Sequence, residues 1–154
     1  MDYGMVKDYW ENKMKLLTLE VNDCDRLDLS GIKNIKFENI AGIMAFLGTN
    51  GSGKSSLLRM MSPLPADKAD FGKEGYVIVR LEHNSVVYRL TSDFRKGAMY
   101  SFVVENNEEE LNEGGTLTAQ KQLVMTYFKY NAMTHNLLTG DEEFTEMNPK
   151  RRKE

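Results

Sequence analysis

Hydrophobic and polar positions divide the chain into short apolar segments separated by polar turns. Three segments before residue 50 have strand-like patterns: residues 14–21 are mostly apolar, residues 32–37 alternate, and residues 43–47 form a continuous apolar run. Alternation is typical of a strand with one exposed face, and a short continuous run is consistent with a buried strand. We therefore expect two early strands, followed by a third, buried strand that ends at Leu47.

The pattern changes to that of a helix over residues 55–61, and two prolines follow directly. Each proline removes an amide donor and disfavours helical backbone in the residue before it, so we expect the helix to end there and a loop to continue to Gly75. Residues 76–81 and 86–90 then flank a four-residue polar turn, which predicts a β-hairpin.

The last third of the chain predicts one more strand and several helical segments. A strand is expected over residues 99–104, a solvated acidic loop over 105–115 and a helix over 118–130. Residues 141–147 fit another helical turn. Asn148-Pro149 has the pattern of a further helix start, and the last five residues only begin that helix, so we expect the front portion of a longer protein.

Residues 48–55 read Gly-Thr-Asn-Gly-Ser-Gly-Lys-Ser, a complete G-x-x-x-x-G-K-[ST] phosphate-binding motif between an expected strand and an expected helix. Glycines let successive backbone N–H groups turn toward phosphate oxygens, and the start of a helix favours negative charge. Lys54 is placed to reach the β- and γ-phosphates, and Ser55 to bind Mg²⁺. A glycine-rich turn without a ligand rarely carries Lys-Ser at this offset. We expect a nucleoside triphosphate to bind through Asn50, Gly51, Ser52, Gly53, Lys54, Ser55 and Ser56.

Length and composition favour one folded unit. The 154 residues with 41% hydrophobic content can bury one core, so we expect an N-terminal extension over residues 1–13 and a single lobe over residues 14–154. The longest apolar runs are far shorter than the roughly 20 residues that cross a bilayer, and charges interrupt the N-terminus. We therefore expect no membrane association and a cytoplasmic location.

Charge and cysteine usage add no second chemistry. The net charge of −3 provides no overall electrostatic basis for binding nucleic acid, and the basic residues 150–153 are interpreted as a solvated helix face. Cys24 is the only cysteine, and His83 and His135 have no Cys or His neighbours. These residues therefore do not predict a disulfide or a zinc site.

Hydrolysis would require a carboxylate that holds Mg²⁺ at the end of an apolar strand and a group that orients water. Glu105, after Phe102-Val103-Val104, is the nearest candidate, but it follows an expected antiparallel meander. Gly114-Gly115 lacks the Leu-Ser-Gly-Gly-Gln context of an ABC signature. Motifs of guanine-binding GTPases and the arginine-rich lid of small kinases are not evident either. We expect no catalytic residue within this chain.

The order of an early strand pair, the loop Thr-Asn-Gly-Ser-Gly-Lys-Ser-Ser-Leu-Leu, a β-meander and the late Pro149-Lys150-Arg151-Arg152 resembles the N-terminal half-head of SMC-like ABC ATPases. It is most similar to the SbcC / Rad-fifty family, including the bacteriophage recombination endonuclease subunit. The resemblance implies an α/β P-loop NTPase fold, the N-terminal lobe of an ABC-ATPase head, with a β-meander and a few helices. It also implies ATP and Mg²⁺ as ligands.

Within that resemblance, residues 135–144 correspond to the Q-loop region, where the family senses Mg²⁺ and the attacking water. Thr139 stands where glutamine is usual before Gly140, so Thr139 is a candidate Mg²⁺-site residue that departs from the family pattern. Arg26 is a candidate adenine-side contact, with an ordinary surface arginine as the alternative.

The function implied is that of the ATP-binding half of a DNA double-strand-break repair and recombination ATPase, which dimerises on ATP and regulates a partner nuclease. Its expected partners are a C-terminal ATPase lobe, a second copy, an SbcD-type nuclease and DNA. ATP hydrolysis is expected of the full-length protein, and the fragment alone is expected to be inactive. The alternatives are a stand-alone, non-hydrolysing nucleotide-binding module and another SMC-like ATPase of the RecF or overcoming-lysogenization-defect type.

Overall fold

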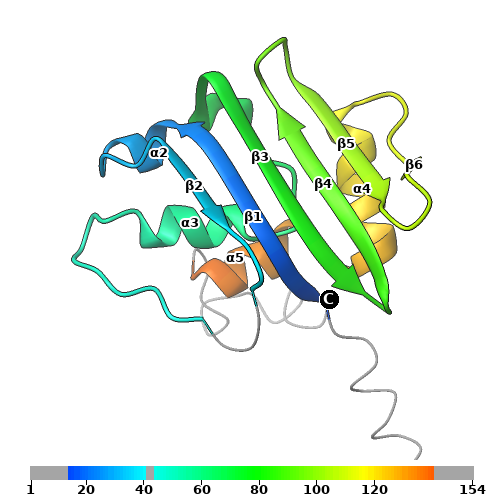
Figure 1. The fold of residues 1–154 in the computed structure, drawn as a ribbon, viewed down its shortest axis with the longest axis horizontal. Coiled ribbons are helices and arrows are strands. Elements are labelled where there is room, and N and C mark those ends of the chain that lie inside the picture. The colour runs from blue at the N-terminus through cyan, green and yellow to red at the C-terminus, as the bar shows by residue number, and fades with distance from the viewer. Residues whose placement is uncertain (1–13, 41–43, 141–154) are drawn as a thin grey trace, which may run out of the picture.

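The computed structural model describes residues 14–40 and 44–140, and these residues are organised around one antiparallel sheet of six strands (Figure 1). The strands lie in the order β2-β1-β3-β4-β5-β6, and each neighbouring pair is antiparallel. The strands are β1 (Lys15–Cys24), β2 (Asn34–Phe37), β3 (Phe71–His83), β4 (Val86–Asp93), β5 (Met99–Val104) and β6 (Glu109–Glu110).

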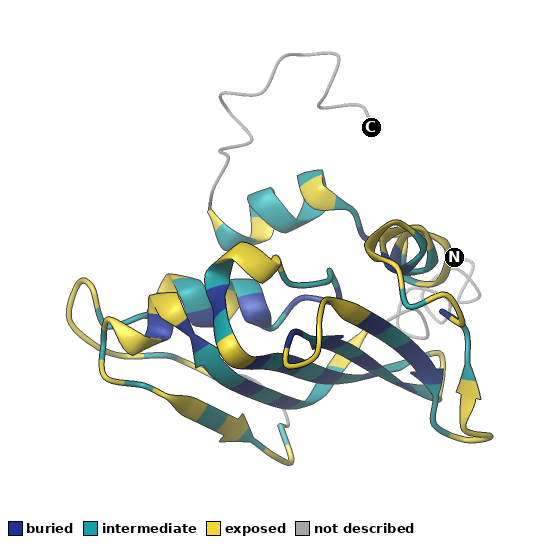
Figure 2. Cartoon of the chain, turned by 90° about the horizontal axis from the view of Figure 1, so that it is seen from above, coloured by how far each residue is buried: buried dark blue, intermediate teal, exposed yellow. Residues whose placement is uncertain are grey.

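Three helices cover one side of this sheet, as the views in Figures 1 and 2 show together. In the described part of the chain, the opposite side of the sheet carries no helix. A short helix follows β1, and a 3₁₀ turn precedes β3. The helical elements are α2 (Asp25–Asp28), α3 (Lys54–Met60), η1 (Lys68–Asp70), α4 (Leu117–Phe128) and α5 (Ala132–Thr139).

Alternation along the strands places the core between the sheet and the helices. In β3, Val77, Val79 and Leu81 are buried, whereas Ile78 and Arg80 between them point to the other face and are only partly buried. An aromatic cluster joins α4 to the sheet, because the rings of Tyr88, Phe102, Tyr127 and Phe128 lie 5.3 to 5.7 Å apart.

Local sequence signals explain most element boundaries. The Thr116 side chain accepts a hydrogen bond from the Ala119 N–H at 3.3 Å and caps α4, and the Asn131 side chain does the same for α5 from the Thr134 N–H at 3.0 Å. α3 ends at Met60, before the prolines, as the sequence predicts.

The expected fold class is wrong. An α/β P-loop NTPase fold requires a parallel sheet in which the strand before the loop is buried, but every strand pair here is antiparallel. Residues 44–47 form no strand, and Leu47 is 93% exposed. The apolar run pairs with no strand of the sheet, although the edge strands β2 and β6 each have one unpaired side. Among residues 44–47, only Phe46 packs inward, with its ring 5.8 Å from Phe37.

Other expectations are confirmed or corrected in detail. The two early strands, the hairpin, β5 and the helix α4 are confirmed. The loop expected to reach Gly75 is wrong, because β3 begins at Phe71 and pairs there with Cys24. The acidic segment is not entirely a solvated loop, since β6 lies within it. α2 and α5 were not expected from the pattern.

Several predictions fall outside the described residues. These are the extension over 1–13, Ile43, the helical turn over 141–147, the helix start at 148–149 and the basic residues 150–153. Among the described helices, none is long and apolar enough to cross a lipid bilayer.

Candidate phosphate-binding loop

The candidate site is the loop of residues 48–53 and the first turn of α3 (Figure 1). Gly51 and Gly53 have φ angles of 83° and 84°, in the left-handed region that residues with a Cβ rarely adopt. At Gly48, an added Cβ would lie 2.6 Å from the Ser52 Oγ. The backbone path therefore favours glycine at positions 51 and 53, whereas a side chain at position 48 would require Ser52 to move.

The Lys54 side chain folds back across this loop. Its Nζ donates hydrogen bonds to the carbonyl oxygen of Gly48 at 2.8 Å and of Thr49 at 2.7 Å, and it lies 3.4 Å from the Ser52 Oγ. A lysine ammonium has three donors, so its donors are directed at the oxygens of the loop itself. The Lys54 ammonium is thereby held against the carbonyl oxygens of the loop.

The surroundings of the loop favour an anion over a cation. α3 begins at Lys54, so the N–H groups of its first turn have no intrahelical acceptor. The first turn carries no acidic residue. Ser55 is exposed in this turn and Ser56 follows it, so both hydroxyls belong to the same end of the helix. Asn50, at the tip of the loop, is also exposed.

α2 and the turn after it support the loop, and the sequence analysis did not predict this support. The Ser30 Oγ donates a hydrogen bond to the Gly51 carbonyl at 2.8 Å. Leu27 is buried, and its Cδ2 would lie 3.2 Å from a Cβ added at Gly53. The available signal was Leu27 itself, an apolar residue in the mostly polar segment between the two early strands.

Thr139, the candidate at the Q-loop position, is the last residue of α5. Its Oγ1 donates to the carbonyl of His135 at 3.0 Å and lies 3.5 Å from the carbonyl of Asn136. The hydroxyl is thus engaged with its own helix, as is common for threonine within helices.

The candidate carboxylate Glu105 has a structural role. Its oxygens accept hydrogen bonds from Arg80 at 2.7 and 2.5 Å, and hydrogen bonding to this guanidinium lowers the pKa of Glu105 although burial opposes the shift. Across the described ranges 14–40 and 44–140, no group of three or more His, Cys, Asp or Glu side chains could hold a metal ion. Ser55, the other residue predicted from the sequence to bind Mg²⁺, is exposed in the first turn of α3.

Arg26, the candidate adenine-side contact, forms an ion pair with Asp70. Its Nε donates to Asp70 at 2.8 Å, and both residues line a pocket beside the C-terminal end of α3. Lys54, at the loop, begins the same helix. Arg26 therefore lies at the edge of this pocket.

Comparison of the chain with protein-family models and with curated proteins gave no match.

Proposed function

We propose that this chain binds a nucleoside triphosphate with Mg²⁺ through the loop of residues 48–53 and the start of α3. The observation that carries the proposal is the position of the Lys54 ammonium, held over the glycine-rich loop by the carbonyls of Gly48 and Thr49. A lysine in this position offers a positive charge to phosphate oxygens, which accept stronger hydrogen bonds from an ammonium than neutral carbonyls do.

Each remaining residue of the motif has a separate task in this proposal. The positive φ angles of Gly51 and Gly53 allow a backbone path that a residue with a side chain resists, so N–H groups can approach the phosphates. Ser55 would supply a hydroxyl to Mg²⁺, and Asn50, Ser52 and Ser56 would complete the polar lining. Mg²⁺ would neutralise part of the phosphate charge and keep several of its own waters.

The test is the affinity for a fluorescent ATP analogue in the presence of Mg²⁺, measured by fluorescence titration. Lys54→Ala removes charge-assisted contacts worth roughly 1.5 to 3 kcal/mol, so we expect the dissociation constant to rise about tenfold or more. Lys73→Ala is the matched control, since Lys73 is an exposed lysine of β3 outside the loop. It should bind like the unmodified chain.

Equal affinities of the Lys54→Ala variant and the unmodified chain would refute the proposal, provided that circular dichroism shows both to be folded. Replacing ATP by AMP provides an independent check. AMP lacks the β- and γ-phosphates that Lys54 is expected to contact, so its affinity should be lower in the unmodified chain and nearly insensitive to the Lys54→Ala change.

On the sequence resemblance alone, we also propose a wider role for this site. ATP bound here would promote association with a second copy and a C-terminal ATPase lobe, and would thereby regulate a partner nuclease in DNA double-strand-break repair. The antiparallel sheet adds no support to this role, which rests on the motif and the order of segments. Hydrolysis would require groups that the described residues do not supply, so this chain alone is expected not to turn ATP over.

A further inference from the structure

A second concave site lies beside the other end of α3. It is a pocket of about 460 Å³, within the range of volumes typical for small-molecule sites. Arg59 and Met60, at the C-terminal end of α3, contribute to its lining, whereas Lys54 at the phosphate-binding loop begins the helix. The pocket is therefore distinct from the site of the proposed function, and the inference drawn from it does not depend on that function.

The wall formed by residues 62–67 is tied to the sheet. The Ala66 N–H donates to the Ser92 Oγ at 3.1 Å, and the Tyr100 hydroxyl lies 3.5 Å from the Ala66 carbonyl. Anchoring on both sides of one residue fixes the path of the loop. In the facing wall, the Tyr130 hydroxyl lies 3.4 Å from the His135 Nδ1. The loop side of the pocket is thus anchored to the sheet.

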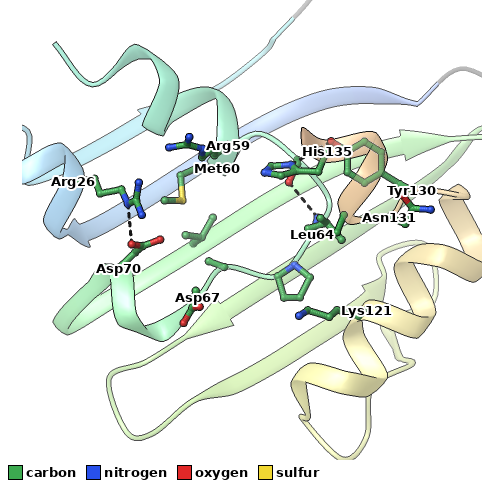
Figure 3. Close-up of a pocket in the computed structure, with 15 residues that line it drawn as sticks. Arg26, Arg59, Met60, Leu64, Asp67, Asp70, Lys121, Tyr130, Asn131 and His135 are labelled. Atoms are coloured by element: carbon green, nitrogen blue, oxygen red, sulfur yellow. Dashed lines mark hydrogen bonds and ion pairs between the residues drawn. The ribbon is translucent and has the colours of Figure 1, made fainter. Parts of the chain in front are cut away.

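The interior of the pocket is apolar and its edges are charged (Figure 3). Met60 and Val77 are buried core residues that face it, and Leu64 lines it from the loop. Burial also raises the pKa of the Tyr130 phenol, which keeps this group neutral. An apolar ring or chain of a ligand would therefore lie among aliphatic side chains.

The charges at the edges favour an anion. Arg26 is paired with Asp70 at 2.8 Å, and the Asp67 carboxylate accepts a hydrogen bond from the Ala69 N–H at 3.0 Å. Lys121 reaches toward the pocket from α4, on the side away from the Arg26–Asp70 pair (Figure 3). Among the described residues, the Lys121 ammonium makes no hydrogen bond or ion pair. The carboxylates are thus engaged while one ammonium keeps its donors available.

We propose that this pocket binds a small amphipathic organic anion. Its apolar body, aromatic or aliphatic, would lie against Met60, Leu64 and Val77, and its single carboxylate or similar acidic group would lie at the Lys121 ammonium. The size of the pocket restricts the ligand to a small molecule, and the Lys121 ammonium favours an acidic group on that ligand.

The test uses two dyes that share an apolar body and differ in charge: anilinonaphthalene sulfonate, which is an anion, and phenylnaphthylamine, which is neutral. We expect the anionic dye to bind the full chain saturably, at one site per chain, and more tightly than the neutral dye. Lys121→Gln should weaken the anionic dye about three- to fivefold, as expected for an exposed charge pair, and should leave the neutral dye unchanged.

Two variants complete the design. Ala132→Trp places a large side chain at an exposed position of the pocket rim and should remove saturable binding of both dyes. Lys73→Gln removes an equivalent charge away from the pocket and should change nothing. Lys54→Ala should also bind both dyes like the unmodified chain, which separates this site from the nucleotide site.

The inference is overturned if the anionic dye does not bind saturably. It is also overturned if Lys121→Gln binds the anionic dye as tightly as the unmodified chain, because Lys121 is exposed and its replacement should not affect folding. The inference is overturned as well if the Ala132→Trp variant has unchanged circular dichroism and still binds the dyes saturably, because the dyes would then bind elsewhere.

Discussion

The Glu110 carboxylate lies in the segment where a solvated acidic loop is expected, yet it is a structural group. It accepts hydrogen bonds from the Ser101 hydroxyl, from the Phe102 N–H at 2.8 Å and from the Asn112 N–H at 2.8 Å. Burial acts to raise the pKa of Glu110, but these three donors outweigh it and hold the pKa below its ordinary value. The carboxylate therefore stabilises the folded state in its charged form.

Glu110→Gln should lower the free energy of unfolding at pH 7 by about 1 to 3 kcal/mol, because an amide accepts more weakly and its NH₂ group faces a donor. The pKa of Glu110 is lower in the folded state, so its contribution is complete above the unfolded value of about 4.3 and is lost as the pH falls through the folded value. Urea unfolding at pH 7 and near pH 3 measures the free energy of unfolding of both chains and hence this contribution.

The difference between Glu110→Gln and the unmodified chain should therefore shrink in acid. Glu109→Gln is the control, since Glu109 is exposed and its carboxylate accepts a hydrogen bond from the Asn107 side chain. A difference that is the same at both pH values would show that the charge of Glu110 is not responsible.

At the scale of elements, α2 and α3 meet beneath the phosphate-binding loop, and Gly53 is the point of contact. Gly53 caps α3 in the left-handed region, with φ of 84°, and a Cβ there would lie 3.2 Å from Leu27. Gly51 has nearly the same φ, 83°, but nothing lies within 4 Å of an added Cβ. Gly53→Ala and Gly51→Ala thus share the backbone cost and differ in the contact with α2.

We expect Gly51→Ala to destabilise the fold by about 1 to 2 kcal/mol, the cost of left-handed backbone for a residue with a Cβ. Gly53→Ala should cost more, because Leu27 or α3 must also move. Urea unfolding of the two variants at the same pH gives the comparison. Equal destabilisation would mean that α2 does not support α3 at this point.

The elements also show which signals in the sequence are sufficient. β4, β5 and α4 follow from alternation and spacing, because their patterns describe one buried face each. The apolar run before the loop misleads, because a short continuous apolar run does not by itself determine whether the segment joins a sheet, and residues 44–47 form no strand. β6 has only two residues, so its pairing with Val103 and Val104 leaves no periodic pattern.

The parts of the candidate site that lie close together in the sequence could be predicted. Gly51, Gly53 and Lys54 could be identified because the spacing of the motif defines the turn. The support of the loop by Ser30 and Leu27 could not be predicted, because it depends on the tertiary contact between α2 and the loop. The pocket has the same limitation: Arg26, Asp70 and Lys121 come from segments separated by many residues, and no periodicity brings them together.

At the scale of the whole molecule, exposed leucines flank the loop. Leu47, which precedes Gly48, is 93% exposed, and Leu29, which precedes the Ser30 that bonds to the loop, is 90% exposed. Scattered exposed leucines are ordinary on protein surfaces, but these two lie beside the proposed nucleotide site. A surface that covered the bound nucleotide would also cover them, which fits the proposed association with a second copy.

ATP can drive such association only as far as it binds the associated state more tightly than the separate chains. We expect Mg²⁺-ATP to shift the sedimentation coefficient of the chain toward that of a dimer, in a concentration-dependent manner. Lys54→Ala should sediment alike with and without ATP, and the combined Leu29→Glu and Leu47→Glu changes should suppress the shift while ATP is still bound. If the unmodified chain binds ATP and sediments unchanged at all concentrations, the chain binds nucleotide without self-association, and the stand-alone module becomes the better account of its function.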